Sequence, residues 1–187
     1  AGLTASDIEA AYVGNAAAGL VTGQECIRGQ VVLRSAGIGK IPVVNVENAC
    51  ASASTALHQA AAMVTAGLYD VVLALGVEKL YDEDKRKSFA AFSGAVDVEA
   101  LAEIMARLKE GARETGAAAS EGAGQNRSMF MDIYAASARS HMKRFGTTER
   151  QFARIASKNS FHGSLNPRAQ FREHLSLADV LAAPMIA

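Results

Sequence analysis

The chain is 187 residues long, which is enough for one ordinary domain or for one domain with a large insertion. Half of the residues are hydrophobic and 20% are charged, so the composition excludes a chain that is disordered throughout. Basic and acidic residues tie at 19 each, and this zero net charge, with no long basic stripe, argues against a nucleic-acid partner.

The cysteines and the ends of the chain bear on its compartment. Cys26 and Cys50 are too few for a disulfide framework and fit a reducing environment. No secretory signal is visible, and the longest uncharged stretch, residues 50–69, is too polar for a membrane span. The composition therefore favours the cytoplasm. Both ends look cut, so we expect a piece of a longer protein.

The first forty residues predict one strand and one helix. Thr4 and Asp7 have the spacing of a capping box, which favours a short turn or helix end at residues 3–8. Residues 10–18 predict a buried strand that runs into a loop of small residues. Residues 24–36 have a helical pattern that Gly37 ends, with Cys26 expected in the core of that helix.

The next forty residues predict a strand–helix–strand unit. Residues 41–46 are a β-branched run of the kind found in the middle of a sheet. A long helix of small residues follows to about residue 66, and residues 70–77 predict a second buried strand. Because such a unit joins parallel strands, the fold class is predicted to be α/β with a parallel sheet.

After Lys79 the sequence becomes mostly helical. Residues 82–87 are a dense charge cluster and predict a solvated loop. One apolar helix face is predicted by Val98, Leu101, Met105 and Leu108, in a helix that stops near Gly111. Residues 116–124, rich in Ala, Gly and Ser, predict a loose segment.

The last sixty residues predict three more helices. One covers residues 129–145 and is stopped by Gly146, and a short one covers residues 177–182 after an irregular stretch at 161–176. Between them a capping box of Thr148 and Gln151 starts another helix, with Phe152, Ile155 and Ala156 expected to point inward. The predicted organisation is an α/β core at residues 1–80, a helical insertion at 81–175 and a return segment at 176–187.

Cys50 is the residue best placed for chemistry. It lies where a predicted buried strand meets the first turn of a helix, whose unpaired N–H groups and positive dipole end stabilise a thiolate and a developing oxyanion. Its neighbours Ala49, Ala51 and Ser52 are small, so a bulky thioester could approach the sulfur. The alternative is a small apolar core residue, because free cysteine is often buried.

Several segments resemble the thiolase superfamily. Residues 45–58 read NVENACASASTALH and residues 67–79 read GLYDVVLALGVEK, which are similar to the nucleophile segment of thiolases. Ketosynthases share a similar cysteine elbow. The later stretches HMKRFGTT, ASKN, NPRAQFR and DVLAAPMIA resemble the sterol-carrier-protein-type (lipid-transfer) thiolases and acetyl-CoA acetyltransferases. The resemblance implies a thiolase-like layered domain, the N-terminal half only, with a helical loop domain inserted.

The resemblance also implies an activity. Cys50 would attack an acyl-CoA or 3-ketoacyl-CoA and become an acyl-thioester, with its own backbone N–H as an oxyanion donor. Coenzyme A or a second acyl-CoA would then take the acyl group, as substrate and not as a permanently bound cofactor. Phe130 and Met131 are the counterparts of the segment beside the pantetheine arm. No metal ion is expected. Family members are homodimers or homotetramers, and residues 41–46 would lie in the dimer contact.

The histidine and second cysteine that complete catalysis in the family have no counterpart motif here. His58 is eight residues beyond Cys50, about 12 Å along a helix, which is too far for direct proton transfer. His141, His162 and His174 are not convincing bases either. Three hypotheses follow: a working thiolase nucleophile in the intact enzyme, a thiolase-fold lyase or aldolase without a cysteine nucleophile, or an inactive CoA-binding or oligomerisation module.

Overall fold

The computed structural model describes residues 2–114 and 129–185. The chain divides into two compact units, Ala1–Val98 and Glu99–Ala187, which are described separately. The boundaries predicted from the sequence, at about residues 80 and 175, stay predictions. Within the described residues, the structure contains no helix that is both long and apolar enough to cross a membrane.

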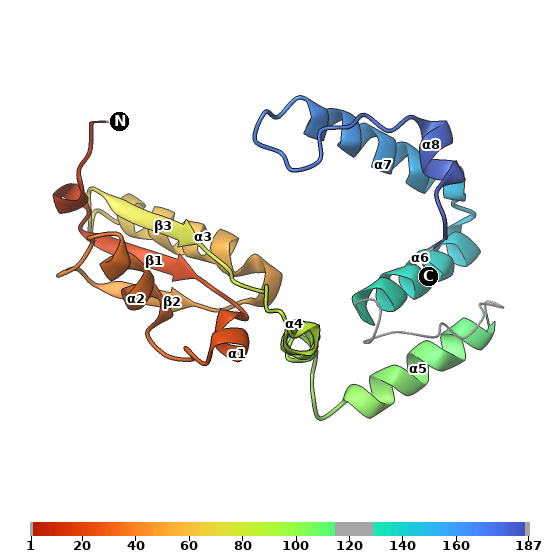
Figure 1. Ribbon diagram of the computed structural model, residues 1–187, viewed down its shortest axis with the longest axis horizontal. Helices are drawn as coiled ribbons and strands as arrows, with labels where there is room; N and C mark the ends of the chain where they lie inside the picture. The colour runs from red at the N-terminus through yellow and green to blue at the C-terminus, as the bar shows by residue number, and fades with distance from the viewer. Residues whose placement is uncertain (1, 115–128, 186–187) are drawn as a thin grey trace. The chain divides into compact units, whose positions relative to one another are not determined.

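The first unit is built on a parallel three-stranded sheet (Figure 1). Its strands are β1 (Ala10–Gly14), β2 (Val43–Val46) and β3 (Val72–Gly76), in the order β2-β1-β3. In the register, Tyr12 of β1 pairs with Val44 of β2 and with Ala74 of β3. The predicted α/β class with a parallel sheet is thus confirmed.

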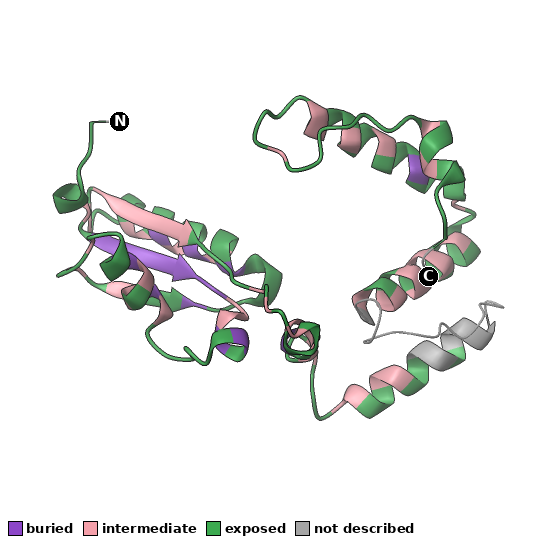
Figure 2. Cartoon of the chain, viewed as in Figure 1, coloured by how far each residue is buried: buried purple, intermediate pink, exposed green. Residues whose placement is uncertain are grey.

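The position of β2 differs from the prediction. Its β-branched sequence favoured the middle of the sheet, but β2 has one partner among the described strands, β1, and so lies at the edge. Every residue of β1, in contrast, is buried, as the purple central strand of Figure 2 shows. The prediction was wrong because β-branched residues also suit an edge strand with one covered face.

Helices cover both faces of this sheet because alternate side chains of β1 point to opposite sides. On one face, Tyr12 and Val46 pack against Ala56 and Ala60 of α3 (Ser52–Thr65). On the other, Ala11 and Val13 pack against Leu33 of α2 (Arg28–Ser35). The predicted small-residue helix is therefore α3, and its alanines let it lie close to the strands.

The short helices of the first unit include two departures from the predictions. The 3₁₀ turn η1 (Ala5–Asp7) has the predicted capping box. Helix α1 (Ala18–Thr22), however, forms where a loop was predicted, and α2 begins only at Arg28. Cys26 consequently precedes α2 and is exposed, so its predicted burial in a helix core was wrong. The helical pattern of residues 24–36 did not show that Ile27 adopts a left-handed conformation, with φ of 49°, which delays the start of the helix.

The charge cluster at residues 82–87 is partly helical. Helix α4 (Lys85–Ser93) begins within it, because the Asp84 carboxylate caps the helix by accepting a hydrogen bond from the Arg86 amide at 3.1 Å. The Arg86 side chain also donates to this carboxylate, and these hydrogen bonds lower the pKa of Asp84 to about 2. The predicted loop was therefore wrong for residues 85–87. The capping carboxylate remains charged at all ordinary pH values.

The second unit consists of helices among the residues described. They are α5 (Leu101–Glu114), α6 (Met129–Phe145), α7 (Glu149–Ser164) and α8 (Leu177–Ala182). The predicted α6, its stop at Gly146 with φ of 68°, the capping box of α7 and the final helix are confirmed. The loose segment predicted at residues 116–124 lies outside the described residues.

The predicted inward face of α7 was wrong. Phe152, Ile155 and Ala156 are all exposed, and Ala153 is the buried residue of this helix. Helix α7 contacts the short helix α8, and Ser157 and Ser160 donate hydrogen bonds to the Leu175 carbonyl ahead of it. Because α8 has only six residues, it covers only a small part of the surface of α7, and the rest of that surface stays exposed. Helix α7 also extends to residue 164, into the stretch predicted to be irregular.

Candidate active site

Cys50 lies in a tight turn between β2 and α3. The turn is a single 3₁₀ turn, η2 (Ala49–Ala51), after which α3 begins at Ser52. The thiol is free, and the residue is exposed, so the alternative of a buried core cysteine is excluded for this structure. The predicted position at a strand–helix junction is confirmed, whereas the catalytic role of Cys50 stays a prediction.

The backbone of this turn is strained and held in place by hydrogen bonds. Ala49 has φ of 44°, a left-handed conformation that costs a non-glycine residue about 1–2 kcal/mol. The Ser52 hydroxyl accepts a hydrogen bond from the Asn48 amide at 2.9 Å and donates one to the Ala49 carbonyl at 2.7 Å. The Glu47 carboxylate accepts from the Ala49 amide at 2.6 Å. These bonds fix the direction in which the turn presents Cys50.

The backbone amide of Cys50 is available to a ligand. In the turn, the Ala49 amide donates to Glu47, and the Ala51 amide donates to the Asn48 carbonyl at 2.9 Å. Within the part of the chain that the structure describes, the Cys50 amide donates to no protein group. An N–H group beside the sulfur can therefore donate to an oxygen that becomes negative when the sulfur attacks a carbonyl carbon.

Two glycines let the strands approach the start of α3. A Cβ on Gly14, the last residue of β1, would lie 2.6 Å from the carbonyl carbon of Ser52. A Cβ on Gly76, the last residue of β3, would overlap the Cβ of Ala53. The first turn of α3 therefore packs against the end of β1 through its backbone and against the end of β3 through the Ala53 side chain.

Replacing Ser52 with alanine should destabilise the turn. Ser52 is 5% exposed, and the change leaves the Asn48 amide without its acceptor, so we expect a loss of about 1–2 kcal/mol in the free energy of unfolding. Urea denaturation of the intact protein measures it. Ser54→Ala is the matched control, because Ser54 lies on the same helix and is exposed, and its change should stay within about 0.5 kcal/mol. Equal effects of the two substitutions would contradict this account of the turn.

Asn15 and Glu78, which were not predicted as site residues, lie beyond the carboxyl ends of β1 and β3. The Asn15 side-chain amide donates to the Val77 carbonyl at 2.7 Å and to the Glu78 carboxylate at 3.1 Å. The same carboxylate accepts the amides of Ala16 and Ala17, each at 2.9 Å. The available signal was that polar residues follow two parallel strands within two positions, and the carboxyl ends of these strands share one edge of the sheet.

Glu78 stays ionised to lower pH than an ordinary glutamate. Partial desolvation raises the pKa of Glu78, but hydrogen bonds from the amides of Ala17, Ala16 and Lys79 outweigh it, and the net pKa is lowered. Because the pKa is lowered in the folded state, the ionised carboxylate stabilises the fold at pH values above the ordinary pKa of glutamate. This stabilisation is lost as the pH falls through the lowered pKa of Glu78.

His58, the histidine in the same unit as Cys50, is not placed as its partner. His58 is exposed on α3, eight residues beyond the cysteine, as predicted from the sequence. His141 lies 4.7 Å from the Phe145 ring, and the rings of His162 and His174 lie 5.7 and 5.1 Å from Phe161. Among the described residues, no group of three His, Cys, Asp or Glu side chains could hold a metal ion.

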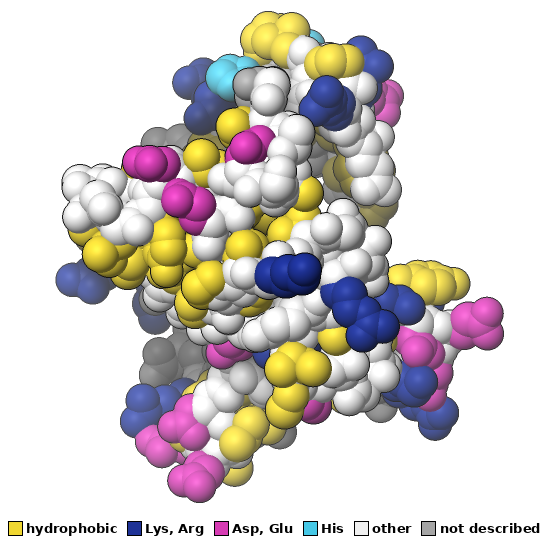
Figure 3. All heavy atoms as spheres, turned by 90° about the vertical axis from the view of Figure 1, so that its left-hand side faces the viewer, with side chains coloured by type: hydrophobic (Ala, Val, Ile, Leu, Met, Phe, Trp, Pro, Cys, Tyr) yellow, Lys and Arg dark blue, Asp and Glu magenta, His cyan; other side chains and the backbone are white. Residues whose placement is uncertain are grey.

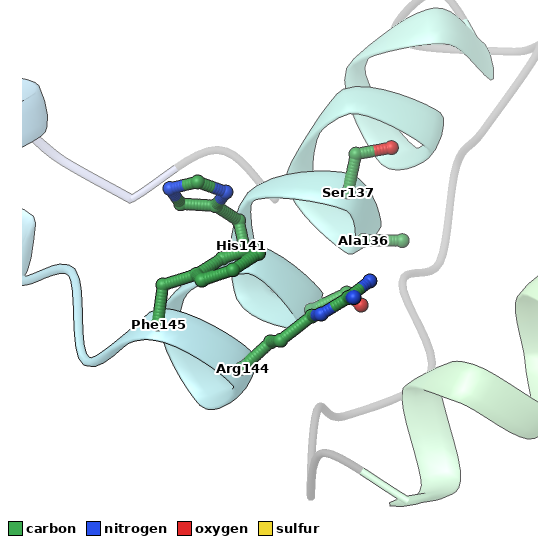
Figure 4. A pocket seen from close by; sticks show the side chains of 6 residues that line it. Ala136, Ser137, His141, Arg144 and Phe145 are labelled. Carbon is green, nitrogen blue, oxygen red and sulfur yellow. The ribbon is translucent and has the colours of Figure 1, made fainter.

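The predicted CoA contacts, Phe130 and Met131, lie at the start of α6 in the second unit. The Met131 side chain is 53% exposed, and the Phe130 ring lies 6.4 Å from that of Tyr134. Their role stays a prediction. Further along α6 is an open hollow of about 420 Å³ (Figure 4), with these described lining residues: Ala136, Ser137, Ser140, His141, Arg144 and Phe145.

Comparison with known proteins identifies the family. Residues 1–176 match the family described as "Thiolase, N-terminal domain". The chain is 35% identical, over its full length, to an acetyl-CoA acetyltransferase of Methanothermobacter thermautotrophicus, and covers 42% of that protein. It is 33% identical to sterol carrier protein 2 of Gallus gallus, with 97% of the chain and 29% of that protein aligned.

A third relative is the benzoylsuccinyl-CoA thiolase subunit BbsB of Thauera aromatica, 30% identical over 96% of the chain and 39% of the relative. The chain thus spans less than half the length of each of these relatives. The family match covers the sheet, the cysteine turn and most of the helical unit. On these grounds, this chain belongs to the thiolase family, as its N-terminal domain.

Proposed function

We propose that this protein is an acyl-CoA acyltransferase of the thiolase type in which Cys50 is the nucleophile. The observation that carries the proposal is an exposed thiol beside a backbone amide with no protein acceptor among the described residues, both on a strained turn. Relatives named acetyl-CoA acetyltransferase and thiolase support the reaction class.

The chemistry follows from this arrangement. The Cys50 thiolate attacks the carbonyl carbon of an acyl-CoA or 3-ketoacyl-CoA, while the Cys50 amide donates a hydrogen bond to the oxygen that becomes negative. When that intermediate collapses, an acyl-CoA loses the thiolate of coenzyme A by cleavage of its C–S bond, or a 3-ketoacyl-CoA loses the enolate of acetyl-CoA by cleavage of its C2–C3 bond. The leaving group takes up a proton, and an acyl-thioester remains on Cys50. Coenzyme A then takes the acyl group in thiolysis, or a second acyl-CoA takes it in condensation. Coenzyme A is a substrate here, and we assign the base to none of the four histidines.

Two further parts of the proposal concern binding. Phe130 and Met131 are proposed to contact the pantetheine arm of the substrate. The protein is proposed to form a homodimer or homotetramer, with the strand segment at residues 41–46 in the contact. Exposed hydrophobic side chains support association: Leu57 and Val64 of α3, and Leu68 just after it, are 61, 44 and 64% exposed. The face drawn in Figure 3 likewise shows hydrophobic side chains between charges of both signs. Light scattering measures the mass of the assembly.

Acyl transfer to Cys50 can be observed directly. The intact protein is incubated briefly with acetyl-CoA, quenched in acid, weighed by mass spectrometry and digested for peptide mapping. We expect one added acetyl group, located on Cys50 and absent from Cys26, which is also exposed and serves as an internal control. A protein without any adduct would instead support an inactive CoA-binding or oligomerisation module, and acetylation of both cysteines would indicate non-specific chemistry.

A further inference from the structure

We infer that Glu78 is a positioning residue, which acts through Asn15 to hold the Cys50 turn in the geometry that acyl transfer needs. The inference rests on the proposed function of Cys50. It starts from the hydrogen bonds at the carboxyl edge of the sheet, where Glu78, Asn15 and the turn all lie beyond the ends of neighbouring strands.

Glu78 is hydrogen-bonded to the residues that follow β1. One carboxylate oxygen of Glu78 accepts the amides of Ala16 and Ala17, and the other accepts the side-chain amide of Asn15. A neutral group could not accept all three with equal strength, because hydrogen bonds to an ionised carboxylate are about twice as strong as those to a neutral acceptor. The carboxylate therefore fixes the path of the chain immediately after Gly14.

Asn15 in turn is hydrogen-bonded to the end of β2, the strand that leads into the Cys50 turn. Its backbone amide donates to the carbonyl of Val46, the last residue of β2, at 3.1 Å, while its side chain donates to Val77 beyond β3. Asn15 thus ties the ends of all three strands together. From Val46 the chain runs directly into the turn, with Cys50 four residues further on.

The end of β1 also contacts the start of α3, where Gly14 lies against Ser52. Because a Cβ on Gly14 would lie 2.6 Å from Ser52, the backbone at the end of β1 touches the residue whose hydroxyl holds the Cys50 turn. A shift of the segment that Glu78 fixes would therefore move Ser52, or open a gap beneath it. Interiors transmit such shifts because they are closely packed.

The side chain of Asn15 is only partly satisfied by hydrogen bonds at this edge. The residue is 7% exposed, and its side-chain carbonyl oxygen is buried with no hydrogen-bond partner among the described residues. A buried acceptor without a partner lowers stability, and such costs gather at functional sites. This fits a residue whose role is carried by the two hydrogen bonds that its side chain donates.

The chain offers a matched control in Glu9, which lies at the opposite end of the same sheet. The Glu9 carboxylate also accepts two consecutive backbone amides, those of Asp70 and Val71 at 2.5 and 2.9 Å, just before β3 begins. Glu9 and Glu78 thus make the same kind of contact, but only Glu78 lies at the edge that carries Cys50.

The experiment compares Glu78→Gln with Glu9→Gln in the intact protein. Gln keeps the size of the side chain, but its amide group opposes the Asn15 donor. We expect Glu78→Gln to lower the first-order rate of Cys50 acetylation at saturating acetyl-CoA by about 10- to 100-fold, as expected for a displaced reacting group. Glu9→Gln should leave this rate within about twofold, and both should shift the melting temperature similarly. Glu78→Asp keeps the charge but has a shorter side chain, so its acetylation rate should fall less than that of Glu78→Gln.

Hydrogen–deuterium exchange of the amides of residues 46–52 gives a second readout that does not depend on chemistry. We expect faster exchange there in Glu78→Gln and no change in Glu9→Gln. A Glu78→Gln protein that acetylates at the wild-type rate, or two variants with equal losses, would overturn the positioning role. A wild-type protein that is not acetylated overturns the proposed function instead, and with it this role for Glu78 in acyl transfer.

Discussion

Replacing Cys50 with alanine should abolish acyl transfer, with turnover falling by about four orders of magnitude or more, because the proposed acyl-thioester forms on the Cys50 sulfur. Cys50 is exposed on a turn whose own amide can donate to the developing oxyanion. Steady-state turnover of the intact protein with acetyl-CoA, or with a 3-ketoacyl-CoA and coenzyme A, is the measurement.

Cys26→Ala is the control for this prediction. Cys26 is also a free, exposed cysteine, but it lies between α1 and α2 and not at a strand–helix junction. We expect its turnover to stay within about twofold of wild type, as for other surface substitutions. If Cys50→Ala kept substantial turnover, a thiolase-fold reaction without a cysteine nucleophile would become the better hypothesis.

The second large effect is expected from Gly14→Ala. The added Cβ would lie 2.6 Å from the Ser52 carbonyl carbon and 2.7 Å from the Ala53 nitrogen. Both are backbone atoms at the start of α3, so no side chain can rotate away to relieve the contact. We expect a loss of about 3 kcal/mol in the free energy of unfolding, at the upper end of the range for overpacked interiors. Urea denaturation measures this loss.

Gly39→Ala provides the matched substitution. Gly39 precedes β2, is exposed, and has no atom within 4 Å of the position that a Cβ would take. Its stability should change by less than about 0.5 kcal/mol. In Gly14→Ala we also expect slower acetylation of Cys50 in the protein that remains folded. A Gly14→Ala protein as stable as Gly39→Ala would show that the strands and α3 do not touch as described.

Local signals in the sequence predicted most of the elements. The β-branched and small-residue runs predicted the three strands and α3, although only β1 is buried along its whole length, and β3, predicted to be buried, is half-buried. Capping boxes located the starts of η1 and α7, since the Thr side chain and the acceptor three residues later satisfy amides within one turn. Glycine correctly marked the end of α6 at Gly146.

The sequence patterns gave wrong predictions where contacts with residues distant in sequence determine which face of a helix is covered or where a strand lies in the sheet. The apolar spacing of Phe152 and Ile155 predicted an inward face, but the spacing says only that two residues share a side of a helix. Which side is covered depends on α8, more than twenty residues away in sequence. In the same way, the position of β2 at the sheet edge depends on pairing with β1, about thirty residues earlier.

The sequence by itself determined the fold class, the family and the one cysteine at a strand–helix junction, because these follow from residue types in local order. Only the tertiary structure decided that Asn15 and Glu78 lie at the edge of the sheet that carries Cys50, and that Gly14 touches Ser52. These residues are up to 63 positions apart. Parallel strands bring their carboxyl ends together through long connections, so sequence distance gives no measure of their proximity.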